Sequence, residues 1–104
     1  MARTHKARAI QLARMQKACD DWNTANPVGT TVLIKLDGRD EPQLTKTRSK
    51  AQILSGHSVV IWLEGVSGCY LLDRVRAAET EAERPKIAAE LKRKFAPRKM
   101  LQNA

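Results

Sequence analysis

The spacing of apolar residues changes twice along the chain, and this change limits the fold more than any other feature. The spacing is helical, near 3.6 residues, at both ends and near two residues in the middle. In the first segment, four apolar residues lie within one stripe of about 80° on a helical wheel, which is typical of an amphipathic helix. They are Leu12, Met15, Cys19 and Trp22. The pattern predicts a helix over residues 1–23, which ends where Pro27 and Gly29 indicate a type I turn over residues 26–29.

Residues 27–77 predict a β core, because their apolar residues alternate or form short runs. In the first expected strand, Val32, Ile34 and Leu36 face the core, while Thr31, Lys35 and Asp37 face solvent. Leu33 breaks this alternation. Further extended stretches cover residues 44–54, 59–63 and 69–75, and the stretch 59–63 is apolar on both faces, as in a central strand. Four or five short antiparallel strands with local connections predict a small barrel or curled sheet.

The last segment returns to helical spacing over residues 80–96. Ile87, Leu91 and Phe95 form its apolar stripe. Thr80 and Glu83 match a capping box, but Pro85 allows the alternative that the helix begins at this proline. Residues 97–104 form a basic tail. The sequence therefore predicts one α+β domain over residues 1–104, with a helix on each side of an antiparallel β core.

Positive charge is concentrated at the two ends of the chain. The formal net charge is +8, to which residues 1–19 contribute +5, residues 20–83 contribute −3 and residues 84–104 contribute +6. Clustered Lys and Arg gain free energy by releasing the counterions condensed on phosphates. The distribution indicates a compact body with cationic ends that bind a polyanion. The alternative is that these cations only form a hydrated surface that keeps the protein soluble.

Three sets of cations are candidate nucleic-acid contacts. The first lies opposite the apolar stripe of the N-terminal helix and surrounds Ile10; it consists of Arg3, Lys6, Arg14 and Lys17. The second projects from one face of the stretch 44–54, with Thr45, Thr47 and Ser49 on the other face; it consists of Lys46, Arg48 and Lys50. The third lies at the C-terminal end; it consists of Lys92, Arg93, Lys94, Arg98 and Lys99. The second set also fits an edge strand that charge protects from aggregation.

The sequence favours a protein without catalytic activity. Cys69, His57 and Asp73 supply the residue types of a nucleophile, a base and an orienting acid, but Cys69 and Asp73 would lie about 13 Å apart along one strand. Neither a C-x-x-C nor an H-x-x-H pair occurs, and no Gly-rich phosphate loop is found, so we expect no metal and no cofactor. Both cysteines suit reduced core positions. Trp62 and Tyr70 could stack on bases, although we expect them in the core.

The longest apolar run, residues 59–63, is far shorter than the ~20 residues of a membrane span. The first residues are charged and no apolar segment follows them, so a signal peptide is not indicated. We therefore expect a cytoplasmic protein that does not enter a membrane.

Residues 22–76 are similar to short uncharacterised proteins of bacterial chromosomes, plasmids and prophages. The similar residues are Trp22-Asn23, Asn26-Pro27-Val28-Gly29-Thr30, Thr47-Arg48-Ser49, Ala51, Gly56-His57 and Gly68-Cys69. The β core also resembles Src-homology-three-like and KOW-like small barrels in strand number and length. The resemblance implies an accessory protein of a mobile element, and it assigns no functional residue.

Together these observations predict a non-catalytic accessory protein that binds the backbone of DNA or RNA through its basic terminal helices. The alternative is a protein-interaction module of a phage or plasmid that inhibits a host defence or transcription complex. Ile10 among the bases fits that alternative as well.

Overall fold

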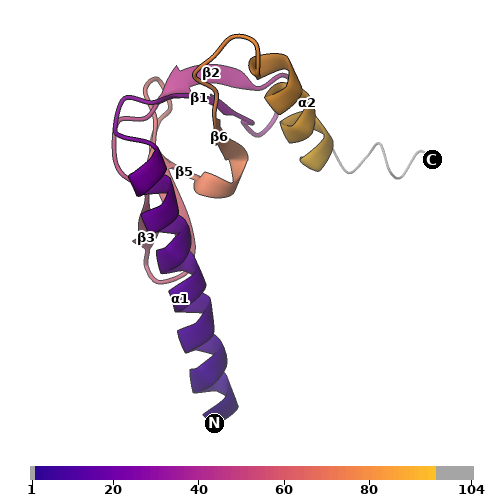
Figure 1. Ribbon diagram of the computed structural model, residues 1–104. Coiled ribbons are helices and arrows are strands. Elements are labelled where there is room, and N and C mark those ends of the chain that lie inside the picture. The colour runs from indigo at the N-terminus through magenta and orange to yellow at the C-terminus, as the bar shows by residue number, and fades with distance from the viewer. Residues whose placement is uncertain (1, 96–104) are drawn as a thin grey trace, which may run out of the picture.

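The computed structural model describes the backbone of residues 2–95 and the side chains of residues 6–95. Two helices, α1 (Ala2–Ala25) and α2 (Arg84–Lys94), accompany two antiparallel sheets of three strands each (Figure 1). The first sheet has the order β2-β1-β6, formed by Gln43–Lys46, Thr31–Ile34 and Val75–Ala77. The second has the order β3-β4-β5, formed by Gln52–Leu54, Ser58–Trp62 and Cys69–Leu71. The predicted α+β class is confirmed.

Two stretches that the sequence analysis treats as single strands are each divided. The stretch 44–54 becomes β2 and β3, because residues 48–51 leave the ladder after an isolated bridge between Thr47 and Leu63. The stretch 69–75 becomes β5, a 3₁₀ turn η1 (Leu72–Arg74) and the start of β6. These breaks pass the chain between the two sheets, and the described residues do not form a closed barrel.

Helix α1 extends well beyond the sheets at its N-terminal end (Figure 1). It ends two residues later than expected, and the Asn26 N–H just beyond it donates to the Trp22 carbonyl (2.8 Å). The turn that follows is also displaced by one residue, because the Thr30 N–H donates to the Pro27 carbonyl (3.1 Å). Gly29 occupies the third position of this turn, where its φ of +99° requires glycine.

The side chain of Asn23 fastens the C-terminal end of α1 to the β core. Its Nδ2 donates to the Ala51 carbonyl (3.0 Å), and its Oδ1 accepts the Ala51 N–H (2.8 Å). This pair of bonds satisfies a backbone segment that lies between β2 and β3 and has no strand partner. The helix is thereby connected to the point where the chain crosses from one sheet to the other.

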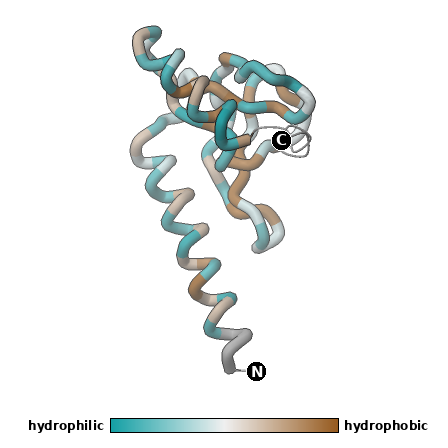
Figure 2. The backbone as a smooth tube through the Cα atoms, turned by 90° about the vertical axis from the view of Figure 1, so that its right-hand side faces the viewer, coloured by the Kyte–Doolittle hydropathy of each residue, from teal (hydrophilic) through white to brown (hydrophobic). Residues whose placement is uncertain are grey.

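The main core lies between α1 and the two sheets. Its buried members are Cys19, Val32, Ile34, Ala51, Ile61, Leu63 and Val75. Hydrophobic residues gather in the strands, whereas polar residues predominate along most of α1 (Figure 2). The inward positions predicted for the first strand are confirmed by Val32 and Ile34, and Leu36 packs against the same cluster.

A second, smaller core lies under α2 and explains the irregular position of Leu33. Leu33, Ala78 and Leu91 are buried together there, so β1 is covered on both faces. The prediction that Lys35 faces solvent is wrong, since this side chain is only 6% exposed. Lys35 follows Leu33 on the face that α2 covers, and the alternation rule does not anticipate a helix there.

Helix α2 begins at Arg84, with Glu83 as its N-cap and Pro85 in the first turn. Glu83 makes no side-chain capping bond and Thr80 lies outside the helix, so the predicted capping box is wrong and the proline alternative is closer. Neither α1 nor α2 carries an apolar stretch of the length that crossing a bilayer requires.

Candidate nucleic-acid interface

The two predicted faces of α1 are confirmed. Cys19 is buried and Leu12, Met15 and Trp22 are partly buried, whereas Lys6, Arg14 and Lys17 on the opposite side are exposed. Arg3 belongs to α1, but its side chain is outside the described part. Ile10 is 53% exposed between these cations, as predicted.

Not every cation of this face is available for a ligand. The Lys17 ammonium donates to the Asp21 carboxylate one helical turn away (2.8 Å), and this hydrogen bond and charge raise the pKa of Lys17. Lys6 and Arg14 have no acidic partner within residues 6–95. They are the strongest phosphate candidates of α1.

Arg8, which the sequence analysis did not single out, lies on the side of α1 that faces the second sheet. Its guanidinium lies 3.4 Å from the place where a Cβ at Gly56 would be, in the turn between β3 and β4. A Cβ at Gly56 would only just touch this guanidinium, and glycine is favoured there by its φ of +70°. The inward side of Arg8 could have been found from a helical wheel, because Arg8 falls within the apolar stripe of α1.

The second set of cations alternates as predicted, although the strand that carries it is interrupted. Lys46, Arg48 and Lys50 are exposed, and Thr47 between them is buried. Arg48 is already engaged, because its Nε donates to the Leu63 carbonyl (3.0 Å). Lys46 and Lys50 keep their ammonium groups toward solvent.

The cations of α2 are largely neutralised by acids of the β core. Lys92 contacts Glu41 at 2.7 Å and Lys94 contacts Asp73 at 3.1 Å. Arg93 is exposed. The partners are distant in sequence, so the local charge count did not reveal them. Arg98 and Lys99 and the predicted tail lie outside the described residues.

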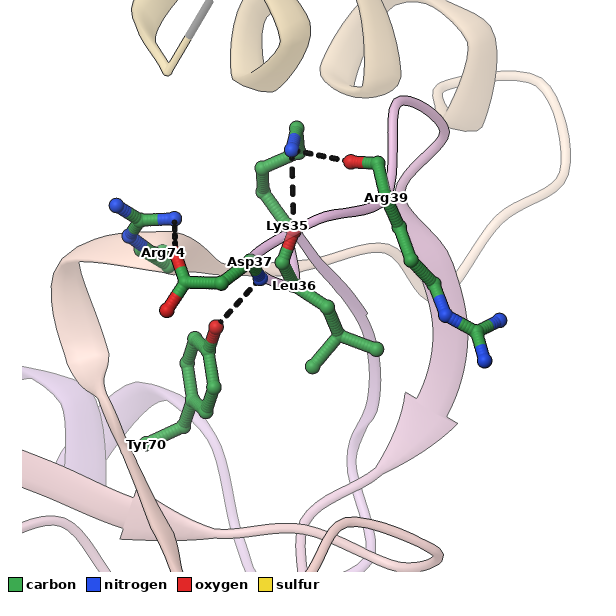
Figure 3. Close-up of polar contacts among 6 residues, drawn as sticks. All are labelled: Lys35, Leu36, Asp37, Arg39, Tyr70 and Arg74. Carbon is green, nitrogen blue, oxygen red and sulfur yellow. Dashed lines mark hydrogen bonds and ion pairs between the residues drawn. The ribbon is translucent and has the colours of Figure 1, made fainter. Parts of the chain in front are cut away.

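A polar network joins the end of β1 to η1 and holds Tyr70 in place (Figure 3). The Arg74 guanidinium donates to the Asp37 carboxylate (2.8 Å), and the Asp37 N–H donates to the Tyr70 hydroxyl (2.7 Å). The buried Lys35 ammonium donates to the carbonyls of Leu36 and Arg39, so its charge is solvated by backbone oxygens. Tyr70 also packs against the main core, as expected.

The expectation that Trp62 belongs to the core is wrong. Trp22 packs against the main cluster, but Trp62 is partly exposed and belongs to neither cluster. Because β4 is apolar on both faces, its sequence does not indicate which face is the inner one.

A groove of about 640 Å³ runs between α1 and the segment β4, η1 and β6. Met15, Trp22, Val59, Leu72 and Val75 form much of its apolar wall. His57 and Asp73 also line it, whereas Cys69 does not, so the three residue types of a thiol enzyme are not assembled here.

Both cysteines are free thiols, and burial raises the pKa of Cys19. Within the part of the chain that the structure describes, no three His, Cys, Asp or Glu side chains are grouped as metal ligands. Comparison with protein-family models, with curated proteins and with solved structures found no match to this chain.

Proposed function

We propose that the protein binds nucleic acid without catalysing a reaction, and that α1 supplies the main contact to backbone phosphates. The observation that carries this proposal is the combination on α1 of a docked apolar face and an opposite face with Lys6 and Arg14, which have no acidic partner among the described side chains of residues 6–95. The helix extends beyond the sheets, so a long polyanion can approach it without contacting the rest of the body (Figure 1).

Lys46 and Lys50 supply secondary phosphate contacts in this proposal. Lys92 and Lys94 contribute less than their number suggests, since a phosphate must first displace Glu41 or Asp73. Phosphate contacts position a protein on nucleic acid and carry no sequence information, so we expect little discrimination among duplex sequences.

The test is the salt dependence of binding to a 20-base-pair DNA duplex. If about five phosphates are neutralised, log K falls against log salt with a slope of about −4 to −5. The variant with Arg3, Lys6, Arg14 and Lys17 all changed to Gln should bind with a much smaller slope and an almost unchanged melting temperature. An unchanged slope would show that this face is only solvated surface.

The same proposal includes the finer points of the fold and the cellular setting. We place the two sheets in an open, curled arrangement similar to Src-homology-three-like barrels, which the bridge between Thr47 and Leu63 supports by joining the two sheets. We also propose a cytoplasmic accessory protein of a phage or plasmid, on the resemblance of residues 22–76.

One observation favours a second candidate function, a module that docks on a host or phage protein complex. The groove beside α1 is mostly apolar and Leu71 in its wall is 46% exposed, which is how a protein interface exposes its anchor positions. The test is a purified partner protein that still binds after nuclease treatment. If Leu71→Asp abolishes that binding, this second function replaces the nucleic-acid proposal.

A further inference from the structure

The second sheet carries an aromatic residue, Trp62, that belongs to neither core cluster. In β4, Ile61 is buried in the main core, and Leu63 just beyond the strand lies in the same core. Successive strand residues face opposite sides, so Val60 and Trp62 face away from that core. Neither belongs to either core cluster, but Val60 is buried, at 3% exposed, whereas Trp62 is partly exposed. The Trp62 indole therefore lies on the opposite face of β4 from the main core, with part of its surface open to solvent.

A cation lies opposite Trp62 on the neighbouring segment. The antiparallel bridge pairs Thr47 with Leu63, so the next pair in register is Arg48 opposite Trp62. The Arg48 N–H donates to the Trp62 carbonyl (2.9 Å), in keeping with this register. Directly opposite residues project on the same face with their Cβ atoms about 5 Å apart. On the other side of β4, Trp62 is paired with Cys69.

The backbone around Trp62 is held by the segment that carries the second set of cations. The Trp62 N–H donates to the Ser49 hydroxyl (3.1 Å), and Arg48 Nε donates to the Leu63 carbonyl (3.0 Å). Lys50 follows and is exposed. Within residues 6–95 the cations found over an aromatic ring, Arg74 and Lys94, both lie over Phe95, so no internal cation occupies the ring of Trp62.

We propose that Trp62 is a stacking platform for an unpaired base of single-stranded DNA or RNA, with Arg48 and Lys50 beside it to hold the neighbouring phosphates. Trp62 is partly exposed. A solvent-accessible aromatic ring flanked by cations is the combination that single-strand binders use, because every base has a π-face. The Arg48 guanidinium also donates to the Val66 carbonyl (3.5 Å), and the rest of its five N–H donors remain for a phosphate. Glu64 lies opposite Lys46 in the same register, and the three cations of this row outnumber it.

This inference deepens the proposed function and rests on it for the phosphate contacts, but it makes a separate prediction. In a duplex the bases are paired and stacked, so Trp62 has no base to receive. Trp62 therefore contributes to the binding of single strands and not of duplexes.

The first experiment uses the Trp22→Phe variant, in which Trp62 is the remaining tryptophan of the two. Titration with the oligonucleotide (dT)12 should quench the fluorescence emission of Trp62 until the protein is saturated. A 12-base-pair duplex should leave most of that emission unquenched. Emission that (dT)12 does not change overturns the proposal.

The second experiment compares variants in the full chain by binding assays at one salt concentration. Trp62→Leu should weaken (dT)12 binding about ten- to a hundredfold, and Trp62→Phe should retain most of it. Duplex affinity should change less than twofold in both. Equal binding of (dT)12 by Trp62→Leu and the unaltered chain overturns the proposal, and if Trp62→Leu does not fold, the quenching result decides.

Failure of the two proposals can be told apart. Changing Lys6 and Arg14 to Gln removes phosphate contacts, so it should weaken the binding of single strands and of duplexes alike. If the protein binds no duplex but (dT)12 still quenches Trp62, the role assigned to α1 fails and the stacking platform stands.

Discussion

The two helices carry similar runs of positive charge but differ in what surrounds them. On α1, Lys6 and Arg14 are exposed on the side opposite the apolar stripe, and no acidic side chain within residues 6–95 pairs with them. On α2, Lys92 and Lys94 lie against the β core and are paired with Glu41 and Asp73. The difference teaches that a cluster of bases is available to a ligand only where tertiary structure brings no acid to it.

The largest effect is expected from weakening the apolar contact that holds α2 against the β core, where Lys92 and Lys94 meet their acids. Leu91 is fully buried in the second core, so Leu91→Ala should lower the free energy of unfolding by about 2–5 kcal/mol. Urea denaturation measures this change. Ile10→Ala, at an exposed position, is the matched control and should change stability by about 0.5 kcal/mol or less. A loss below about 1 kcal/mol for Leu91→Ala would show that α2 is not held by this residue.

The next largest effect is a direct comparison of the two helices in duplex binding. Changing Lys6 and Arg14 to Gln should make the slope of log K against log salt less steep by about 2, since two phosphate contacts are lost. Changing Lys92 and Lys94 to Gln removes the same charge but should alter the slope by less than about 1. Equal effects of the two double variants would contradict the distinction between free and paired cations.

A smaller effect should follow from freeing the cations of α2 without changing them. Glu41→Gln and Asp73→Asn together remove the partners of Lys92 and Lys94, so the slope should become steeper by up to about 2. Stability should fall by about 1 kcal/mol or less for each exposed pair. Calorimetry and the salt titration check both values, and an unaltered slope would mean that α2 does not reach the ligand.

The smallest effect concerns Cys19, which lies under α1 and reports whether that helix is docked. Burial raises the pKa of its thiol in the folded state, so its contribution to stability is present below the thiol's ordinary pKa and declines as pH rises above it. Urea unfolding at pH 7 and pH 9.5 should show a slightly larger loss for the unaltered chain than for Cys19→Ala. In the folded protein, a thiol reagent should modify Cys69 well before Cys19, and equal rates would indicate that α1 separates from the core.

Local periodicity predicted the elements whose partners lie nearby. The apolar stripe of α1 and the alternation of Val32 and Ile34 are properties of short windows, and the structure confirms both. The break after Thr47 was not predictable in this way, because Ser49 and Ala51 are held by Trp62 and Asn23, far away in the sequence. A contact between distant segments leaves no trace in a window of ten residues.

The candidate site was predictable in composition but not in availability. Exposure of Lys46, Arg48 and Lys50 follows from alternation, yet the pairing of Lys92 with Glu41 spans 51 positions. Trp62 could not be assigned to a face, since its strand is apolar on both sides and only the packing of α1 and the first sheet decides which side is inner.

The two hydrogen bonds of Asn23 hold the C-terminal end of α1, so a small rotation of the helix about this end moves its N-terminal end by a larger distance. Lys6 lies 17 positions along α1 from this residue, a distance of about 25 Å, so a rotation of 10° about this end displaces Lys6 by about 4 Å. That displacement is comparable to the spacing between successive phosphates along the axis of one strand, about 3.4 Å. The direction of the cationic face therefore depends on how firmly the other end of the helix is held, by the uncharged Asn23 amide together with Cys19 and Trp22 in the main core.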